Sequence, residues 1–157
     1  MAITLPTAPI QAIDQDPKRL LIYSKPKKGK TTALAALPGC LIVDTENGSD
    51  YITAFKVKVN SIQEINELCK ALKDAKNPYP FIAIDTITML EEVCKPLALK
   101  LYQNTPAGAN YTGDILNAPN GAGWMQLRTA VEMVIDKLEV CTKNLILVCH
   151  CKDAAID

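Results

Sequence analysis

A cluster of lysines that ends in Gly29-Lys30-Thr31 follows a short apolar run, residues 20–23. These three residues match the end of the pattern G-x-x-x-x-G-K-[ST], in which backbone N–H groups surround phosphates, the lysine contacts the β and γ phosphates, and the hydroxyl contacts Mg²⁺. Ser24 stands where the pattern has its first glycine. A strand before the loop and a helix after it favour phosphate binding over the alternative, a solvated lysine-rich turn. The candidate ATP-binding residues are Ser24, Lys25, Pro26, Lys27, Lys28, Gly29, Lys30, Thr31 and Thr32.

The side chains of this loop have different expected roles. Lys25, Lys27 and Lys28 are expected to be solvated and to add positive potential around the phosphates. Replacement of Lys30 should abolish nucleotide binding or hydrolysis, and the fold should survive because Lys30 is expected to lie on an exposed loop. Thr31 is expected to supply an oxygen to Mg²⁺.

Asp85 ends a third apolar run, residues 81–84. A carboxylate at the tip of a buried strand can hold Mg²⁺ through the water shell of the ion, together with the hydroxyl of Thr31. The alternative is a helix N-cap, because Asp85 or Thr86 precedes a segment with helical character. The phosphate-binding loop upstream favours the metal role.

Two further polar residues follow apolar runs. Glu46 comes just after residues 40–43 and is a candidate general base that would orient or deprotonate the water attacking the γ phosphate. A solvated loop acid is the alternative. His150 follows residues 145–149 and is a candidate hydrogen-bond partner of the γ phosphate that would report its presence to the following loop. The alternative is a strand-end histidine without a function.

The apolar runs alternate with amphipathic segments, and this alternation predicts an α/β fold, a parallel sheet with helices on both faces. Parallel sheets bind ligands beyond the carboxyl ends of their strands. The polar residues named above therefore converge at one edge of the sheet. Strands are predicted over 20–23, 40–43, 55–59 (a short edge strand), 81–84 and 145–149, and helices over 31–37, 61–73, 87–102 and 122–142.

Two segments lack this regularity. Residues 1–17 have little periodicity and are predicted to form an N-terminal arm ahead of a core over 18–157. Residues 103–120 are rich in Gly, Pro and Asn and carry no Lys or Arg. A loop of this length in a compact domain is usually functional or disordered, so we expect it to be mobile, with Tyr111 as its single ring available to stack on a base.

The composition fits one globular domain: 157 residues, 48% hydrophobic and 22% charged, which excludes a disordered chain, a fibrous repeat and a disulfide mini-protein. Lys+Arg and Asp+Glu are both 17, so binding of nucleic acid by net charge alone is not expected. The chain has no stretch with the roughly 18 apolar residues of a membrane span, and residues 1–16 do not resemble a signal peptide. We therefore expect a cytoplasmic protein with reduced cysteines.

The order of these segments resembles the ATPase core of RecA-type recombinases, most closely the phage-encoded single-domain members, which are often described as AAA-domain or nucleotide-binding phage proteins. The resemblance covers residues 18–152. It rests on residues 23–32 for the phosphate loop, on 41–46 for the strand with the catalytic glutamate, on 82–87 for the Mg²⁺-binding strand, and on 123–138 with 145–150 for the helix and strand before the second DNA-binding loop. It implies an ATPase with Glu46 as catalytic base, Lys30 on phosphate and His150 as γ-phosphate sensor.

The resemblance also implies partners: single-stranded DNA in phage recombination or replication, and other copies of the chain in a homo-oligomer. Residues 103–120 fall where the family has its first DNA-binding loop. The sequence departs from the family at Ser24, and it has only two arginines, Arg19 and Arg128, neither an obvious arginine finger. RecA-like cores continue beyond the γ-phosphate strand, so we expect a C-terminally shortened chain. The alternatives are a non-catalytic nucleotide-binding or assembly module and a small-molecule kinase, which would need a lid with several arginines.

Overall fold

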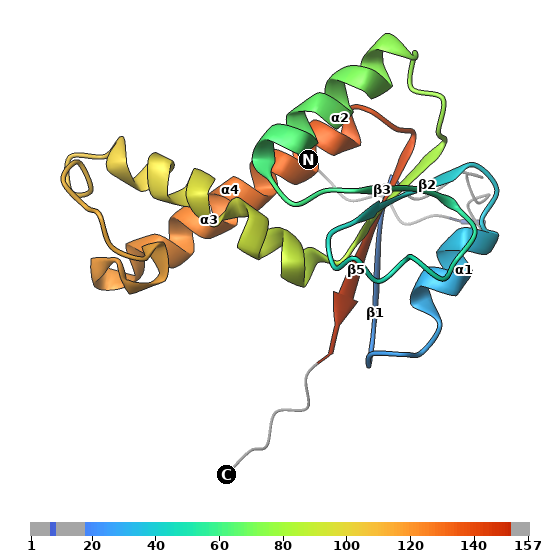
Figure 1. Ribbon diagram of the computed structural model, residues 1–157, viewed down its shortest axis with the longest axis horizontal. Helices are drawn as coiled ribbons and strands as arrows, with labels where there is room; N and C mark the ends of the chain where they lie inside the picture. The colour runs from blue at the N-terminus through green and yellow to red at the C-terminus, as the bar shows by residue number, and fades with distance from the viewer. Residues whose placement is uncertain (1–6, 9–17, 152–157) are drawn as a thin grey trace.

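A five-stranded, all-parallel sheet forms the centre of the protein in the computed structural model, which describes residues 7–8 and 18–151 (Figure 1). The strand order is β1-β5-β4-β2-β3. The strands are β1 (Arg19–Ser24), β2 (Cys40–Asp44), β3 (Phe55–Lys58), β4 (Phe81–Asp85) and β5 (Asn144–His150). The helices are α1 (Lys30–Ala36), α2 (Ile62–Asp74), α3 (Ile87–Gln103) and α4 (Ala122–Glu139), with short 3₁₀ helices η1 (Ile115–Asn117) and η2 (Pro119–Gly121). The predicted α/β class is confirmed.

The register of the strands brings their carboxyl ends to one edge of the sheet. Asp44 at the end of β2 lies opposite Asp85 at the end of β4, and Ser24 at the end of β1 lies opposite His150 at the end of β5. Asp85 is opposite Val148, so β5 continues past β4 and carries His150 beyond the level of the two aspartates. Because β5 lies between β1 and β4, His150 stands between the lysine-rich loop and Asp85.

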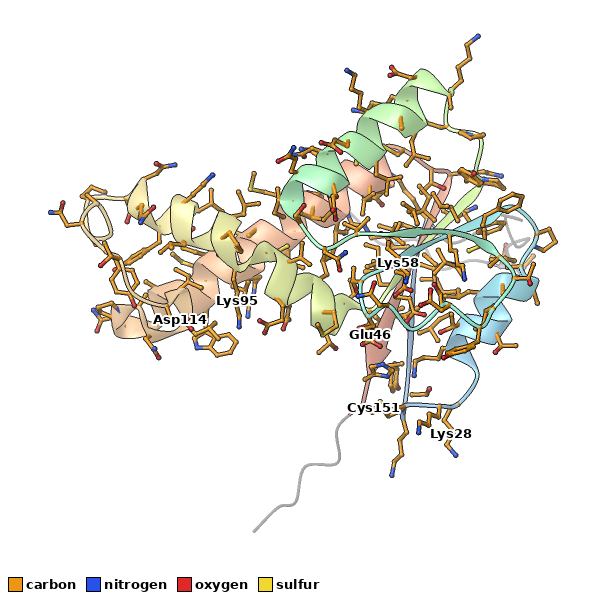
Figure 2. All side chains as sticks on the ribbon, in the orientation of Figure 1. Lys28, Glu46, Lys58, Lys95, Asp114 and Cys151 are labelled. Carbon is orange, nitrogen blue, oxygen red and sulfur yellow. The ribbon has the colours of Figure 1, made fainter. Side chains whose placement is uncertain are left out.

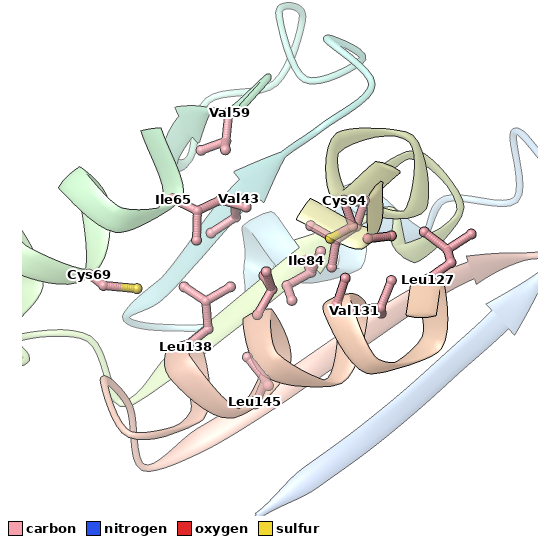
Figure 3. Close-up of a cluster of buried hydrophobic side chains, with 14 of the residues drawn as sticks. Val43, Val59, Ile65, Cys69, Ile84, Cys94, Leu127, Val131, Leu138 and Leu145 are labelled. Atoms are coloured by element: carbon pink, nitrogen blue, oxygen red, sulfur yellow. The ribbon is translucent and has the colours of Figure 1, made fainter. Parts of the chain in front are cut away.

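Helices cover both faces of the sheet, as the sequence predicted, because successive strand residues point to opposite faces. On one face, α1 packs Leu34 against Ile42, Ala83 and Ile146. The larger core lies on the other face, between the sheet and α2, α3 and α4 (Figure 3). Its fully buried members include Val43, Val59, Ile65, Ile84, Cys94, Leu138 and Leu145.

The strand β1 differs from the predicted buried strand. Leu21 is 56% exposed and Tyr23 is 68% exposed, whereas β2 is buried along its whole length. The physical reason is position: among the described residues β1 pairs with β5 alone and forms an edge of the sheet, while β2 has a partner on each side. An apolar run of this kind does not distinguish an edge strand from a central one.

The helices α3 and α4 form an antiparallel hairpin whose tip holds the segment 103–120 (Figure 1). This segment contains η1 and most of η2 and buries Ile115 and Ala118 against the hairpin, so it has secondary structure that its sequence did not predict. Its expected mobility stays a prediction. Gly123, in the first turn of α4, explains the tight packing: a Cβ there would lie 1.6 Å from the backbone oxygen of Ile115. The helix α4 also ends at Glu139, earlier than predicted.

The predicted N-terminal arm lies outside the described residues, apart from residues 7 and 8, as does Lys152. No helix in the described part of the chain combines the length and apolar character that crossing a membrane requires. All six cysteines are free thiols, four of them buried.

Candidate functional site

The loop between β1 and α1 has the backbone shape that its sequence predicts. Gly29 precedes α1 with φ of 82°, in the left-handed region, where a side chain would be strained even though a Cβ would meet no atom within 4 Å. Lys27 also has a positive φ, of 60°. The loop borders a pocket of about 310 Å³ that is lined by Lys27, Lys28, Gly29, Lys30, Thr31, Thr32, Ile52 and His150.

Lys30 is the first residue of α1 and is only 9% exposed, so the expectation of an exposed Lys30 is wrong. Its ammonium group donates hydrogen bonds to the Ser24 backbone oxygen (3.1 Å), the Ser24 hydroxyl (3.0 Å) and the Lys25 backbone oxygen (3.0 Å). These three oxygens satisfy the three donors of an ammonium group. Lys30 therefore lies at the floor of the pocket, held by the end of β1.

Thr31 and Asp85 are in direct contact: the Thr31 hydroxyl donates to Asp85 Oδ2 at 2.6 Å. Asp85 is only 8% exposed. Burial raises the pKa of its carboxyl above the ordinary value; the Thr31 hydrogen bond lowers it, but the nearby carboxylates of Glu46 and Asp44 raise it further. A divalent cation at this carboxylate would offset that excess of negative charge.

The donor set at this place fits Mg²⁺, a hard cation that is bound through one or two carboxylates, substrate phosphates and water. Among residues 18–151, no group of three or more His, Cys, Asp or Glu is arranged to hold a metal ion. The Asp85 carboxylate and the Thr31 hydroxyl are the side chains that would hold Mg²⁺, with nucleotide and water completing its shell.

Asp44 organises the turn that carries Glu46, a role that the sequence analysis missed. Its buried carboxylate accepts hydrogen bonds from the N–H groups of Glu46 (3.0 Å), Gly48 (3.3 Å) and Ser49 (3.0 Å) and from the Ser49 hydroxyl (2.5 Å). Burial alone would raise the pKa of Asp44, but these hydrogen bonds outweigh it and hold the pKa below its ordinary value. An Asp two residues before a turn residue is a recognisable signal for such a turn.

Glu46 reaches back over the ends of β4 and β5. Its Oε1 accepts a hydrogen bond from the Thr86 hydroxyl at 2.6 Å, and its Oε2 lies 3.2 Å from His150 Nε2. The other ring nitrogen of His150, Nδ1, is buried and has no hydrogen-bond partner among the described residues. Figure 2 shows Glu46 at the edge of the sheet that also holds Lys28 and Cys151, whereas Asp114 lies at the far end of the α3–α4 hairpin.

The predicted residues are thus brought together in part. Lys30, Thr31, Asp85, Glu46 and His150 converge at one edge, where Thr31 contacts Asp85, Glu46 contacts His150, and Lys30 contacts Ser24 and Lys25. Lys27, Lys28, Gly29 and Thr32 line the pocket, while Ser24, Lys25 and Pro26 lie outside its lining. Sequence reasoning missed Asp44, Thr45, Ile52 and the contact between Thr86 and Glu46.

The alternatives for Asp85 and Glu46 can be compared with this geometry. Thr86, not Asp85, is the N-cap residue of α3, and no side chain caps that helix. Asp85 instead faces Thr31. Glu46 is not a freely solvated acid, because both of its carboxylate oxygens have partners.

A parallel α/β sheet with a Gly-Lys-Thr loop between its first strand and first helix, and an acidic residue at the tip of β4, defines the fold of a P-loop nucleoside triphosphatase. A family described as AAA domain matches residues 16–157. The chain belongs to this AAA-domain family, whose members are nucleotide-binding domains of the ATPase type that generally bind ATP with Mg²⁺. A search of curated proteins found no match to the chain.

Proposed function

We propose that the protein is a RecA-like, Mg²⁺-dependent ATPase that acts on single-stranded DNA in phage recombination or replication, as a homo-oligomer in the host cytoplasm. The observation that supports the ATPase assignment is the convergence of Lys30, Thr31, Asp85, Glu46 and His150 at one edge of the sheet. The DNA substrate, the phage context and the oligomer rest on the sequence resemblance to RecA-type cores.

In the proposed reaction each residue has one task. The Lys30 ammonium exchanges its contacts with Ser24 and Lys25 for the β and γ phosphates. The Thr31 hydroxyl and the Asp85 carboxylate would hold Mg²⁺, which would supply positive charge to the phosphate oxygens. Glu46 accepts a proton from the attacking water while a new P–O bond forms at the γ phosphorus and its bond to the ADP oxygen breaks. His150 donates a hydrogen bond to the γ phosphate.

The kinase alternative has little support in the structure. Arg19 binds Glu139 (2.5 Å) and Asp136 (2.6 Å), where β1 begins, at the edge of the sheet opposite the pocket. Arg128 is then the remaining arginine of the chain, and one arginine does not make the lid that phosphoryl transfer to a small molecule needs.

The second candidate function is a nucleotide-binding module that does not bind DNA, and one observation favours it. In the segment 103–120 the Tyr111 ring packs edge-on against Tyr102, with centroids 5.3 Å apart, and its hydroxyl donates to the Asp114 backbone oxygen at 2.6 Å. This packing competes with stacking of the ring on a base. The observation bears on the DNA partner, and the hydrolysis assay decides whether such a module is catalytic.

The experiment that tests the proposal is an ATP hydrolysis assay with Mg²⁺, with and without single-stranded DNA, at several protein concentrations. We expect turnover that DNA stimulates, that Lys30→Ala abolishes, and that Glu46→Gln lowers by on the order of a hundredfold while ATP stays bound. Lys95→Ala and Glu92→Gln, which change an ion pair on α3 (2.6 Å), are matched controls that should retain turnover. ATP binding without turnover would favour the non-catalytic module.

A further inference from the structure

Thr86 occupies the N-cap position of α3 but does not cap the helix. An N-cap threonine normally accepts a hydrogen bond from an N–H group in the first turn of its helix. The Thr86 hydroxyl instead donates a hydrogen bond of 2.6 Å to Glu46 Oε1, across 40 residues of sequence. Thr86 is fully buried, so water does not compete for this hydroxyl. The side chain thus serves Glu46 rather than its own helix.

A second threonine fixes the position of this donor. The Thr86 N–H donates to Thr45 Oγ1 (2.9 Å), and the same Thr45 hydroxyl donates to the Thr86 backbone oxygen (2.9 Å). The Thr45 N–H in turn donates to the Asp85 backbone oxygen (2.9 Å). These contacts tie the residue before Glu46 to the residue that binds its carboxylate, so β2 and β4 hold the donor and the acceptor in one arrangement.

The two oxygens of Glu46 have different partners. Thr86 is buried and anchored at both backbone groups, whereas His150 lies at the protruding end of β5 and lines the pocket of the phosphate loop. A histidine that turns to a phosphate releases Oε2, and the Thr86 hydroxyl still holds Oε1. Glu46 Oε2, released by His150, is then the carboxylate oxygen that faces the pocket.

We propose that Thr86 is a positioning residue that holds one carboxylate oxygen of Glu46 and leaves the other to accept a proton from water. This inference rests on the proposed ATPase function. Thr86 is fully buried and lies outside the lining of the pocket, so it acts through Glu46. Without its hydroxyl, the Glu46 side chain regains its rotamers, and the fraction of molecules with a correctly placed base falls.

The test compares Thr86→Ser with Thr86→Ala, a pair that differs by the hydroxyl alone, in the full chain with saturating ATP and Mg²⁺. We expect Thr86→Ala to lower kcat by about tenfold to a hundredfold, the loss that corresponds to a hydrogen bond to a charged group, and Thr86→Ser to restore it to within about threefold of wild type. The KM and the ATP affinity should change less than about twofold, because the ground-state contacts to phosphate remain.

A double-mutant cycle separates positioning from a general loss of structure. In a Glu46→Gln background, Thr86→Ala and Thr86→Ser should turn over at the same rate within about twofold, because the group that Thr86 positions is gone. Melting temperatures of all variants are measured alongside Thr142→Val, which removes another hydroxyl bond, to the Tyr79 backbone oxygen (3.0 Å), where β5 begins. Thr142→Val should retain wild-type kcat.

The outcomes distinguish the inference from the proposed function. One outcome would overturn the positioning role alone. In it, the turnover of the wild type depends on Lys30 and Glu46, but Thr86→Ser and Thr86→Ala have the same kcat. An equal loss of kcat in Thr86→Ala with and without Glu46 would also overturn it, because the effect would then be structural. If the wild type hydrolyses ATP no faster than Lys30→Ala, the proposed function and this inference are both overturned.

Discussion

The ammonium group of Lys30 can bind phosphate only after it leaves oxygens that already hold it. The Ser24 hydroxyl, at 3.0 Å, is the one side-chain oxygen among them, and it stands where the phosphate-loop pattern has glycine. Ser24→Ala removes this acceptor and should tighten ATP binding by about tenfold to a hundredfold, the range for one hydrogen bond to a charged group. Equilibrium titration with a fluorescent ATP analogue measures the change.

Ser24→Thr is the matched control for this prediction, because it keeps a hydroxyl at the same position. Its ATP affinity should stay near that of the wild type. Weaker binding by Ser24→Ala would show instead that the Ser24 hydroxyl contacts the nucleotide, as the original assignment of Ser24 to the ATP-binding loop implies.

Asp85 illustrates how a residue of the candidate site can lower the stability of the fold. Its pKa is raised by burial and by the neighbouring Glu46 and Asp44 carboxylates, so the folded protein binds the Asp85 proton more tightly than the unfolded chain does. The stabilisation from that proton is present at low pH and is lost as the pH rises through the raised pKa, because the buried carboxylate is less favourable when it is ionised. Asp85→Asn should therefore raise the melting temperature relative to the wild type, and the difference should grow as the pH rises through that pKa.

The same Asp85→Asn variant should lose the further thermal stabilisation that ATP with Mg²⁺ gives the wild type, because the carboxylate that would hold the ion is gone. Calorimetry with and without Mg²⁺ and ATP separates the two effects. A lower melting temperature for Asp85→Asn without ligand would mean that the Thr31 contact stabilises the fold more than the buried charge destabilises it.

At the scale of elements, the turn after β2 depends on the Asp44 carboxylate, which is 2% exposed and accepts four hydrogen bonds. Because its pKa is lowered from the ordinary 3.8, its contribution to stability is complete above about pH 3.8 and is lost as the pH falls through the lower, folded-state value. Asp44→Asn should lower the free energy of unfolding at pH 7 by about 1–3 kcal/mol, since an amide cannot accept all four bonds.

Denaturant unfolding between pH 2.5 and 7 (roughly the range over which carboxyls titrate) measures this contribution. The wild type should lose stability at the acid end more steeply than Asp44→Asn. Asp50→Asn is the control, because Asp50 is exposed and pairs with Lys58 at 2.7 Å. A wild type and an Asp44→Asn variant with parallel pH curves would contradict the assignment.

A second prediction at this scale concerns the packing of η1 on α4. A Cβ at Gly123 would lie 1.6 Å from the Ile115 backbone oxygen, so Gly123→Ala must move the hairpin tip. We expect a loss of about 1–3 kcal/mol in the free energy of unfolding, typical of overpacking. Gly48→Ala is the control, because a Cβ there meets no atom within 4 Å. Equal stability of the two variants would contradict the close approach; the ATP affinity of Gly123→Ala should be unchanged.

The elements were predictable where a local pattern decides them. The buried runs and the Ser61 cap of α2, which accepts from the Glu64 N–H at 3.2 Å, are such cases. The hairpin tip was not predictable, because the burial of Ile115 depends on how the flanking helices α3 and α4 pack against each other, which no local pattern in residues 103–120 encodes. The contact of Thr86 with Glu46 was equally hidden, since an N-cap threonine has a strong local explanation that the tertiary structure overrides.

At the scale of the whole molecule, α3 connects the phosphate edge to the segment 103–120. The helix begins directly after Thr86, which holds Glu46, and its 17 residues span about 25 Å before the segment starts. A change at Glu46 is therefore next to the first turn of a helix whose far end carries the proposed DNA contact. If His150 binds the γ phosphate as proposed, this arrangement would give that binding a continuous structural path to the segment.

The resulting prediction is that the wild type binds single-stranded DNA more tightly with a non-hydrolysable ATP analogue than without it, and that His150→Ala removes this difference while ATP stays bound. Residues 103–120 hold no Lys or Arg. The slope of log affinity against log salt concentration should therefore be shallow, smaller than that expected for neutralising about one phosphate. Fluorescence anisotropy across a salt series measures both quantities. A steep slope would place DNA on lysines elsewhere in the chain. If the wild type does not bind DNA at any protein concentration, the nucleotide-binding module is favoured. The contacts of Tyr111 with Tyr102 and Asp114, and the absence of Lys and Arg from residues 103–120, would then explain why this segment does not bind DNA.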